Sequence, residues 1–108
     1  MSLNFAWIAL IVAGIFEVVW AYFLKQSHGF TKVFPVVLFI ITLAISMILL
    51  AYAVKQIPIS IAYPIWVGIG AVGSVIIGVL FFGESLNLIS VLFLALLISG
   101  IVGLKFFS

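Results

Sequence analysis

Hydrophobic residues fill four long stretches of this chain, and polar residues mark the boundaries between them. The stretches cover residues 5–24, 34–54, 58–82 and 88–104. A helix needs about 20 residues to cross the roughly 30 Å of hydrocarbon in a bilayer, and each stretch is long enough. The pattern therefore predicts an all-α integral membrane protein, with one domain over residues 1–108, four transmembrane helices and short loops.

The composition agrees with a chain whose solvent is lipid, and it limits the possible chemistry. Of the 108 residues, 69% are hydrophobic and 6% are charged, unlike the residues of a soluble domain. The chain has no cysteine and a single histidine, His28, in a predicted loop. We therefore expect no disulfide, no metal site and no cofactor. Four scattered lysines are too sparse to indicate nucleic-acid binding. A carboxylate inside the first stretch argues against a cleaved signal peptide.

The charged residues predict an unusual topology. They are Glu17, Lys25, Lys32, Lys55, Glu84 and Lys105. Four spans place two lysines on each side of the membrane, and the positive-inside rule then favours neither orientation. Chains inserted in both orientations can pair as an antiparallel, dual-topology homodimer, which has the inverted symmetry that many transporters carry within one chain. The alternative is an ordinary protein with a single, weakly biased orientation.

Glu17 is the residue most indicative of function. It lies about 18 Å from one end of its predicted helix and about 10 Å from the other, at ~1.5 Å per residue. A charge at such depth costs roughly 2.5 to 3.5 kcal/mol, so it requires a partner or a hydrated cavity. On the same helical face, Ala13 and Gly14 precede it by one turn, and Trp20 and Ala21 follow it by one turn.

Aromatic residues make Glu17 a candidate cation site. Tyr63 and Trp66, three residues apart in the third stretch, share a helical face. With Trp20 they would form an anionic pocket with aromatic walls, suited to an organic cation, although such residues also serve simply in packing. Removal from water favours the neutral form of a carboxylic acid, so Glu17 can hold either a proton or a cation. This competition suffices for antiport. The chain shows no nucleophile and base pair, and we do not expect an enzyme.

Small residues indicate where helices pack closely. In the third stretch they are Gly68, Gly70, Gly73 and Gly78, and in the fourth they are Ser99, Gly100 and Gly103. Residues 68–73 spell G-x-G-x-x-G, but a dinucleotide fingerprint requires a preceding strand in a soluble βαβ unit. We expect instead a bend near Pro64, Gly68 and Gly70, and dimer packing at Gly100 and Gly103.

The motifs resemble those of the small multidrug resistance family of proton-coupled transporters over essentially the whole chain. Residues 62–70, which read AYPIWVGIG, and the Gly83-Glu84 pair are similar to that family. Residues 14–21, which read GIFEVVWA, together with Ser46, resemble its guanidinium-exporting subtype more narrowly. The resemblance implies a multi-pass protein of the bacterial inner membrane, acting as an antiparallel homodimer that exchanges protons for guanidinium by alternating access.

The resemblance also implies roles for individual residues. Trp20, Ser46 and Trp66 would donate hydrogen bonds that orient Glu17, and Tyr63 would contact it. Pro64 departs from the family, which more often has a small residue there, so a bent helix and a wider pocket would admit substituted guanidiniums or guanylurea-like cations.

Three alternatives remain at this point. The nearest is a polyspecific exporter of quaternary ammonium compounds, against which Trp20 and Ser46 argue. A rotor-type proteolipid would carry protons on its membrane carboxylate without any substrate. A non-transporting assembly subunit would leave Glu17 unexplained.

Overall fold

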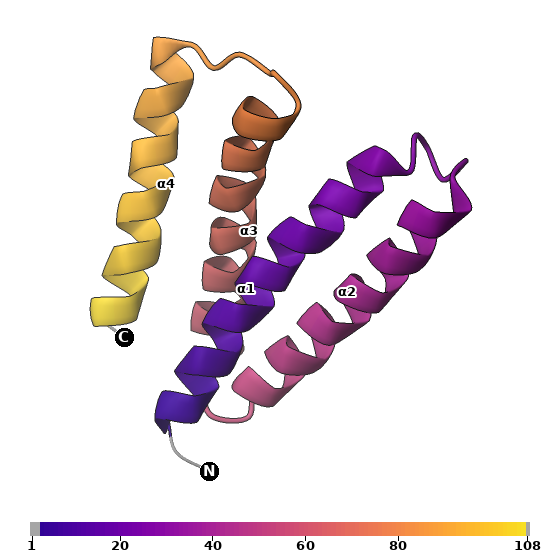
Figure 1. The fold of residues 1–108 in the computed structure, drawn as a ribbon. Helices are drawn as coiled ribbons and strands as arrows, with labels where there is room; N and C mark the ends of the chain where they lie inside the picture. The colour runs from indigo at the N-terminus through magenta and orange to yellow at the C-terminus, as the bar shows by residue number, and fades with distance from the viewer. Residues whose placement is uncertain (1–2, 108) are drawn as a thin grey trace.

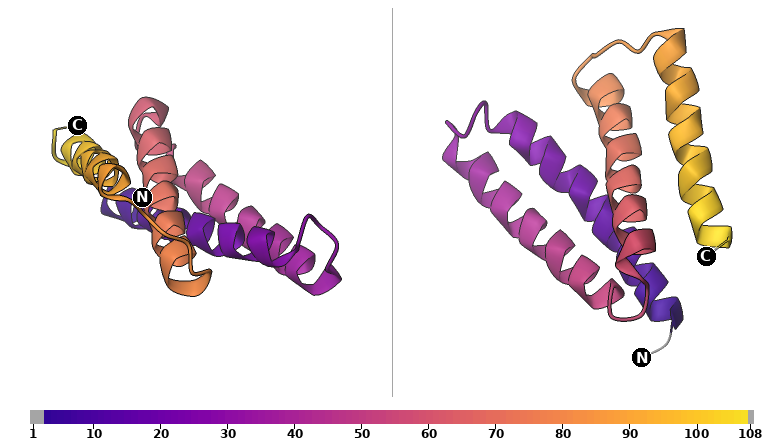
Figure 2. Two further views of the ribbon diagram at one scale, coloured as in Figure 1. Left: turned by 90° about the horizontal axis from the view of Figure 1, so that it is seen from above. Right: turned by 180° about the vertical axis from the view of Figure 1, so that it is seen from behind.

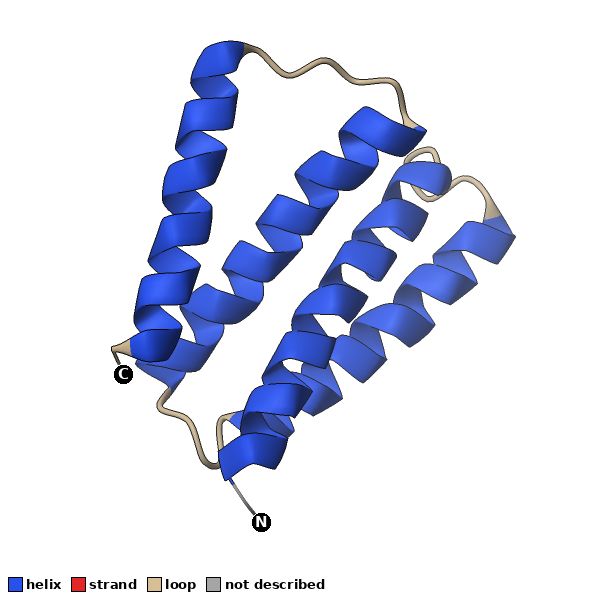
Figure 3. Cartoon of the chain, turned by 60° about the vertical axis from the view of Figure 1, so that its left-hand side comes forward, coloured by secondary structure: helices blue, strands red, loops and turns tan. Residues whose placement is uncertain are grey.

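The structure, a computed structural model, describes residues 3–107 and consists of helices joined by short loops (Figures 1 and 3). The helices are α1 (Leu3–Gln26), α2 (Val33–Ala53), α3 (Ile59–Phe81) and α4 (Leu88–Phe106). All four are long and apolar enough to cross a membrane, which confirms the predicted spans. Their ends differ from the predicted ends by up to two residues.

The helices run alternately up and down, so both termini lie at one end of the molecule (Figure 1). Helix α1 packs against both α2 and α3, whereas α4 packs against α3. The views from above and from behind show α1 crossing α3 at a steep angle, with α4 beyond α3 (Figure 2). The result is a slab of 40 × 35 × 17 Å rather than a closed bundle.

Glycines allow α3 to approach its neighbours closely, because a side chain at these positions would meet the facing helix. A Cβ atom added at Gly14 would lie 2.7 Å from Ile69 Cγ2, and one at Gly68 would lie 2.6 Å from Ile101 Cδ1. Two glycines of the G-x-G-x-x-G string lie at helix contacts: Gly68 faces α4, and Gly73 faces Val18 of α1.

Polar contacts organise the connecting loops. Ser27 is fully buried, and its hydroxyl donates to the Leu24 carbonyl at 2.7 Å and accepts from the Phe30 amide at 3.1 Å. At the start of α4, the Asn87 side chain accepts from the Ser90 amide at 2.8 Å, which caps the helix. Lys25 and Glu84 form an ion pair of 3.2 Å between the end of α1 and the loop before α4.

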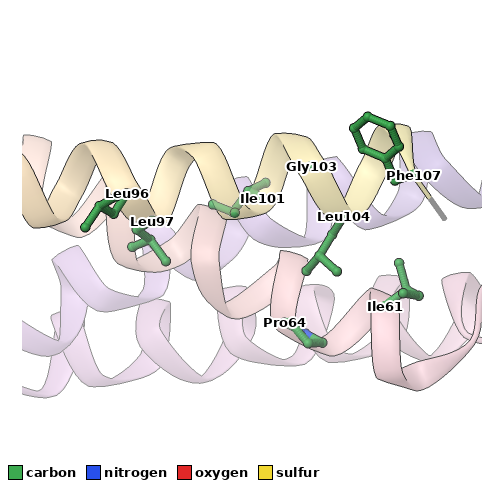
Figure 4. A pocket seen from close by; sticks show the side chains of 9 residues that line it. Ile61, Pro64, Leu96, Leu97, Ile101, Gly103, Leu104 and Phe107 are labelled. Carbon is green, nitrogen blue, oxygen red and sulfur yellow. The ribbon is translucent and has the colours of Figure 1, made fainter.

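Helix α4 leaves most of its apolar surface exposed. None of its described residues is buried, and Phe93 is 62% exposed. A Cβ added at Gly100 or Gly103 would meet nothing within 4 Å. A groove of about 590 Å³ runs between α3 and α4 (Figure 4). It is lined by Ile61, Pro64, Leu96, Leu97, Gly100, Ile101, Gly103, Leu104 and Phe107.

Pro64 lies inside α3, which is assigned as one helix from Ile59 to Phe81. Because proline has no amide hydrogen, the Ser60 carbonyl lacks its usual helical donor at this point. Pro64 faces the groove between α3 and α4 (Figure 4). The bend expected at Pro64, Gly68 and Gly70 stays a prediction.

Candidate functional site

Glu17 lies half-buried on α1, with its carboxylate directly against the backbone of α3. The contact is at Gly70. A Cβ added there would lie 2.5 Å from Glu17 Oε2 and 2.7 Å from Oε1, closer than real side chains approach. The sequence singled out Gly70 as part of a bend, and in the structure its missing side chain makes room for the carboxylate.

A chain of hydrogen bonds joins three helices at the turn that carries Glu17. Trp66 of α3 donates from Nε1 to Ser46 Oγ of α2 at 2.9 Å. The Ser46 hydroxyl in turn donates to the Ala13 carbonyl of α1 at 2.7 Å. Ser46 is fully buried and Trp66 is 7% exposed, so both bonds are protected from solvent. In an α-helix the carbonyl of residue 13 also accepts a hydrogen bond from the amide of residue 17. The two side-chain bonds therefore fix the backbone turn that precedes Glu17.

These bonds differ from the expected ones. Ser46 and Trp66 were expected to donate to the Glu17 carboxylate, but their hydrogens go elsewhere in this structure. The physical reason is that each side chain has one polar hydrogen. The Ser46 hydrogen satisfies a backbone carbonyl, and the Trp66 hydrogen satisfies Ser46. Within the chain, both residues position the helix that carries Glu17.

Trp20 and Glu17 both have unused hydrogen-bonding atoms. Trp20 Nε1 and Glu17 Oε2 are buried, and neither has a hydrogen-bond partner among residues 3–107. The expected bond from Trp20 to Glu17 is therefore not formed here. The Trp20 ring packs edge-on against Phe39, with centroids 5.7 Å apart. A buried donor or acceptor without a partner costs about 1–3 kcal/mol, so the site gains free energy when a bound group satisfies these atoms.

Tyr63 and Gly14 are the other two residues that the sequence assigned to the pocket. Tyr63 and Trp66 have ring centroids 5.6 Å apart, as their shared helical face predicted. Tyr63 is 51% exposed, so its ring lies at the open surface of the chain. Gly14 is buried against Ile69 and allows α1 and α3 to approach at the level of the carboxylate.

The arrangement can bind a proton or a small cation. Among residues 3–107 the recorded ion pair is that of Lys25 with Glu84, and it leaves Glu17 without a fixed cation. In the same part of the chain no three His, Cys, Asp or Glu residues cluster as metal ligands would. What remains is a carboxylate in an apolar setting, one helical turn before Trp20 with its unpaired indole hydrogen, and this setting suits a proton or an organic cation.

Sequence comparisons identify relatives over almost the whole chain. The family described as Small Multidrug Resistance protein matches residues 5–97. The chain is 50% identical over 103 residues to a guanidinium exporter of Proteus vulgaris, and 48% identical over the same length to one of Yersinia pseudotuberculosis. Each match covers 95% of this chain and 99% of the relative. A guanidinium exporter of Escherichia coli K12 is 48% identical over 100 residues, covering 93% of this chain and 95% of the relative.

The relatives are exporters rather than enzymes, which confirms two of the expectations from the sequence: the family resemblance and the absence of an enzymatic role. The four apolar spans and the bacterial relatives also confirm a multi-pass protein of the inner membrane. The chain therefore belongs to the small multidrug resistance family.

Proposed function

We propose that this protein exports guanidinium in exchange for protons, and that two copies of the chain, inserted antiparallel, form the transporting unit. Both Glu17 carboxylates would bind protons and guanidinium alternately as the dimer changes its facing. The observation that carries the proposal is the setting of Glu17. Glu17 is a half-buried membrane carboxylate with no cationic partner among residues 3–107, and its buried Oε2 accepts no hydrogen bond. Trp20, one turn further along the same helix, has a buried indole hydrogen that is also unpaired.

Guanidinium suits this site chemically. It is a flat ion with N–H donors around its edge, and it pairs edge-on with a carboxylate through two parallel hydrogen bonds. Glu17 Oε2 is free to accept such a bond. The exposed ring of Tyr63 would offer an aromatic face to the ion. The close relatives that carry the name guanidinium exporter support the same substrate. Substituted guanidiniums and guanylurea-like cations share the flat, donor-rich edge and belong to the same proposal.

The dimer is supported by the surfaces that a single chain leaves open. Helix α4 buries none of its described residues, and Tyr63 of the site is 51% exposed. A second copy packed on these surfaces would enclose the Glu17 region. Gly100 and Gly103, which have open space beside them, would allow close approach of the second copy. The two-to-two lysine balance allows both orientations to be inserted.

Exchange follows from competition for one group. A charged, empty Glu17 is costly to move through the hydrocarbon region, whereas a Glu17 neutralised by a proton or by guanidinium is not. If the dimer changes facing only in the neutralised states, guanidinium leaves as protons enter. The hydrogen-bond chain from Trp66 through Ser46 to Ala13 would keep the backbone of α1 in place during the exchange.

The test is proton-coupled transport by purified protein in vesicles. A proton gradient should drive uptake of guanidinium, and Glu17→Gln should abolish the exchange while the variant remains folded and dimeric. Faster transport of tetraethylammonium than of guanidinium would instead favour a polyspecific quaternary ammonium exporter. Unchanged exchange by Glu17→Gln, or a large ring of subunits in place of a dimer, would refute the proposal.

A further inference from the structure

A second carboxylate lies on α3 in the same manner as Glu17. The side chain of Glu84, in the loop before α4, folds back over Gly78, and a Cβ at Gly78 would overlap Glu84 Oε1. The Glu84 amide donates to the Gly78 carbonyl at 3.0 Å, which fixes the loop in this position. Gly78 follows Gly70 by eight residues, so the two carboxylates are seated about 12 Å apart along the helix, at ~1.5 Å per residue.

A groove leads inward from Glu84 along α1 and α3. It has a volume of about 320 Å³ and lies between α1 and α3. Its inner end is at Val18, the residue after Glu17, and its outer end is at Lys25 and Glu84. On α3 it is lined by Ser74 and Gly78. Gly70, Ser74 and Gly78 are spaced four residues apart, so they form one row of small side chains along the helix.

A lysine of the chain occupies the outer end of this groove. The Lys25 ammonium lies 3.2 Å from Glu84 Oε2 and 5.5 Å from the centroid of the Phe82 ring. Tyr22, also on the groove, packs against Phe82 with centroids 5.6 Å apart. A carboxylate beside an aromatic face is the combination that binds an organic cation. Lys25 thus holds a place that a free cation could take.

The ion pair is weak enough to be exchanged. The side chains of Lys25 and Glu84 are 58% and 52% exposed, and ion pairs this open to water contribute little to stability. A guanidinium ion would compete well for Glu84, because it can form two parallel hydrogen bonds to the carboxylate, whereas the ammonium binds as a point charge.

We propose that Glu84 and Phe82 form an outer binding site for guanidinium, in which the ion displaces the Lys25 ammonium as it passes along the groove between α1 and α3 to or from Glu17. Lys25 acts as a tethered competitor that fills the site when no substrate is present. The inference rests on the proposed function, since it concerns the path of the same substrate.

The test compares two variants that break the same ion pair. Glu84→Gln removes the site, so the half-saturating guanidinium concentration for transport should rise at least about fivefold. Lys25→Gln removes the competitor, so that concentration should fall about twofold to fivefold, the factor by which an exposed ion pair shifts an equilibrium. Phe82→Leu keeps the ion pair but removes the ring face, and should raise the concentration as well. The maximal rate should stay within about twofold for all three.

Lys32→Gln is the matched control, because it removes the same charge at the same end of the molecule, away from the groove. It also changes the lysine balance across the membrane as much as Lys25→Gln does, and it should leave the half-saturating concentration unchanged. If Glu84→Gln and Lys25→Gln shift the half-saturating concentration in the same direction, the ion pair only stabilises the structure, and the outer site is overturned. An equal effect of Lys32→Gln would mean general electrostatics and would overturn it too. Wild-type protein that does not transport guanidinium would refute the proposed function itself.

Discussion

The contact between Gly70 and Glu17 gives the sharpest prediction for the site. In Gly70→Ala, the new Cβ would lie 2.5 Å from Glu17 Oε2, whereas ordinary van der Waals contact begins at 3.4 Å, so the oxygen has to retreat by about 0.9 Å. The side chain of Glu17 is flexible and can turn aside at little cost, so the variant should fold with nearly wild-type stability. Its carboxylate, however, is displaced from the position in which we propose that it binds the substrate.

A misplacement of about 1 Å in a binding and exchange site costs on the order of 100-fold in rate, or about 2.7 kcal/mol. We therefore expect proton-coupled guanidinium transport by Gly70→Ala in vesicles to fall by roughly this factor. The assay should be normalised to the amount of folded protein, so that a loss of protein is not mistaken for a loss of transport.

Gly68→Ala is the matched control for steric overlap. Its Cβ would lie 2.6 Å from Ile101 Cδ1, a clash of similar size against an apolar side chain of α4. It should lower the Tm in detergent, because overpacking typically costs about 1–3 kcal/mol of stability, while transport per amount of folded protein stays within about threefold of wild type. Equal transport by Gly70→Ala and wild type would refute the view that the Gly70 surface positions Glu17.

Three further predictions concern the surrounding residues. Ser46→Ala should lower the Tm in detergent, because it leaves the buried Trp66 Nε1 without its acceptor at a cost of about 1–3 kcal/mol, and an unchanged Tm would contradict the hydrogen-bond chain. Trp20→Phe should weaken guanidinium binding about tenfold in calorimetry by removing one buried donor to a charged pair, and unchanged affinity would argue against its place in the pocket. Gln56→Lys, beside Lys55, should bias the chain toward one orientation in the membrane and lower transport activity in cells. Co-expression with Gln26→Lys, which biases the chain toward the opposite orientation, should restore the activity. Transport activity that neither change affects would argue against dual topology.

The helices could be predicted from sequence because the hydrocarbon region imposes a length and a polarity on each span. The ends were less exact, since α1 and α4 continue for two residues beyond the apolar stretches, to Gln26 and Phe106. Backbone groups near the interface can keep helical bonds while their side chains are already polar, so hydrophobicity marks the membrane rather than the end of the helix.

The sequence could not predict which side chains meet across the helix contacts. Glu17 stood out because a carboxylate in lipid requires an explanation, and Trp20, Ser46 and Trp66 could be grouped around it. That Ser46 donates to the Ala13 carbonyl, and that Gly70 faces the carboxylate, depends on how α1 crosses α2 and α3. The helical period shows which residues of a single sequence share a face of a helix. It does not show how each helix is rotated about its axis, and this rotation decides which faces of two helices meet.

The proposed competition between protons and guanidinium for Glu17 can be measured directly. Purified protein in weakly buffered solution, at a pH where Glu17 is protonated, is mixed with guanidinium while a pH indicator records released protons. Wild type should release protons in step with binding, up to one for each Glu17 that gives up its proton, and Glu17→Gln should release none. Guanidinium binding to wild type without proton release, or equal release by both proteins, would contradict the shared-carboxylate mechanism.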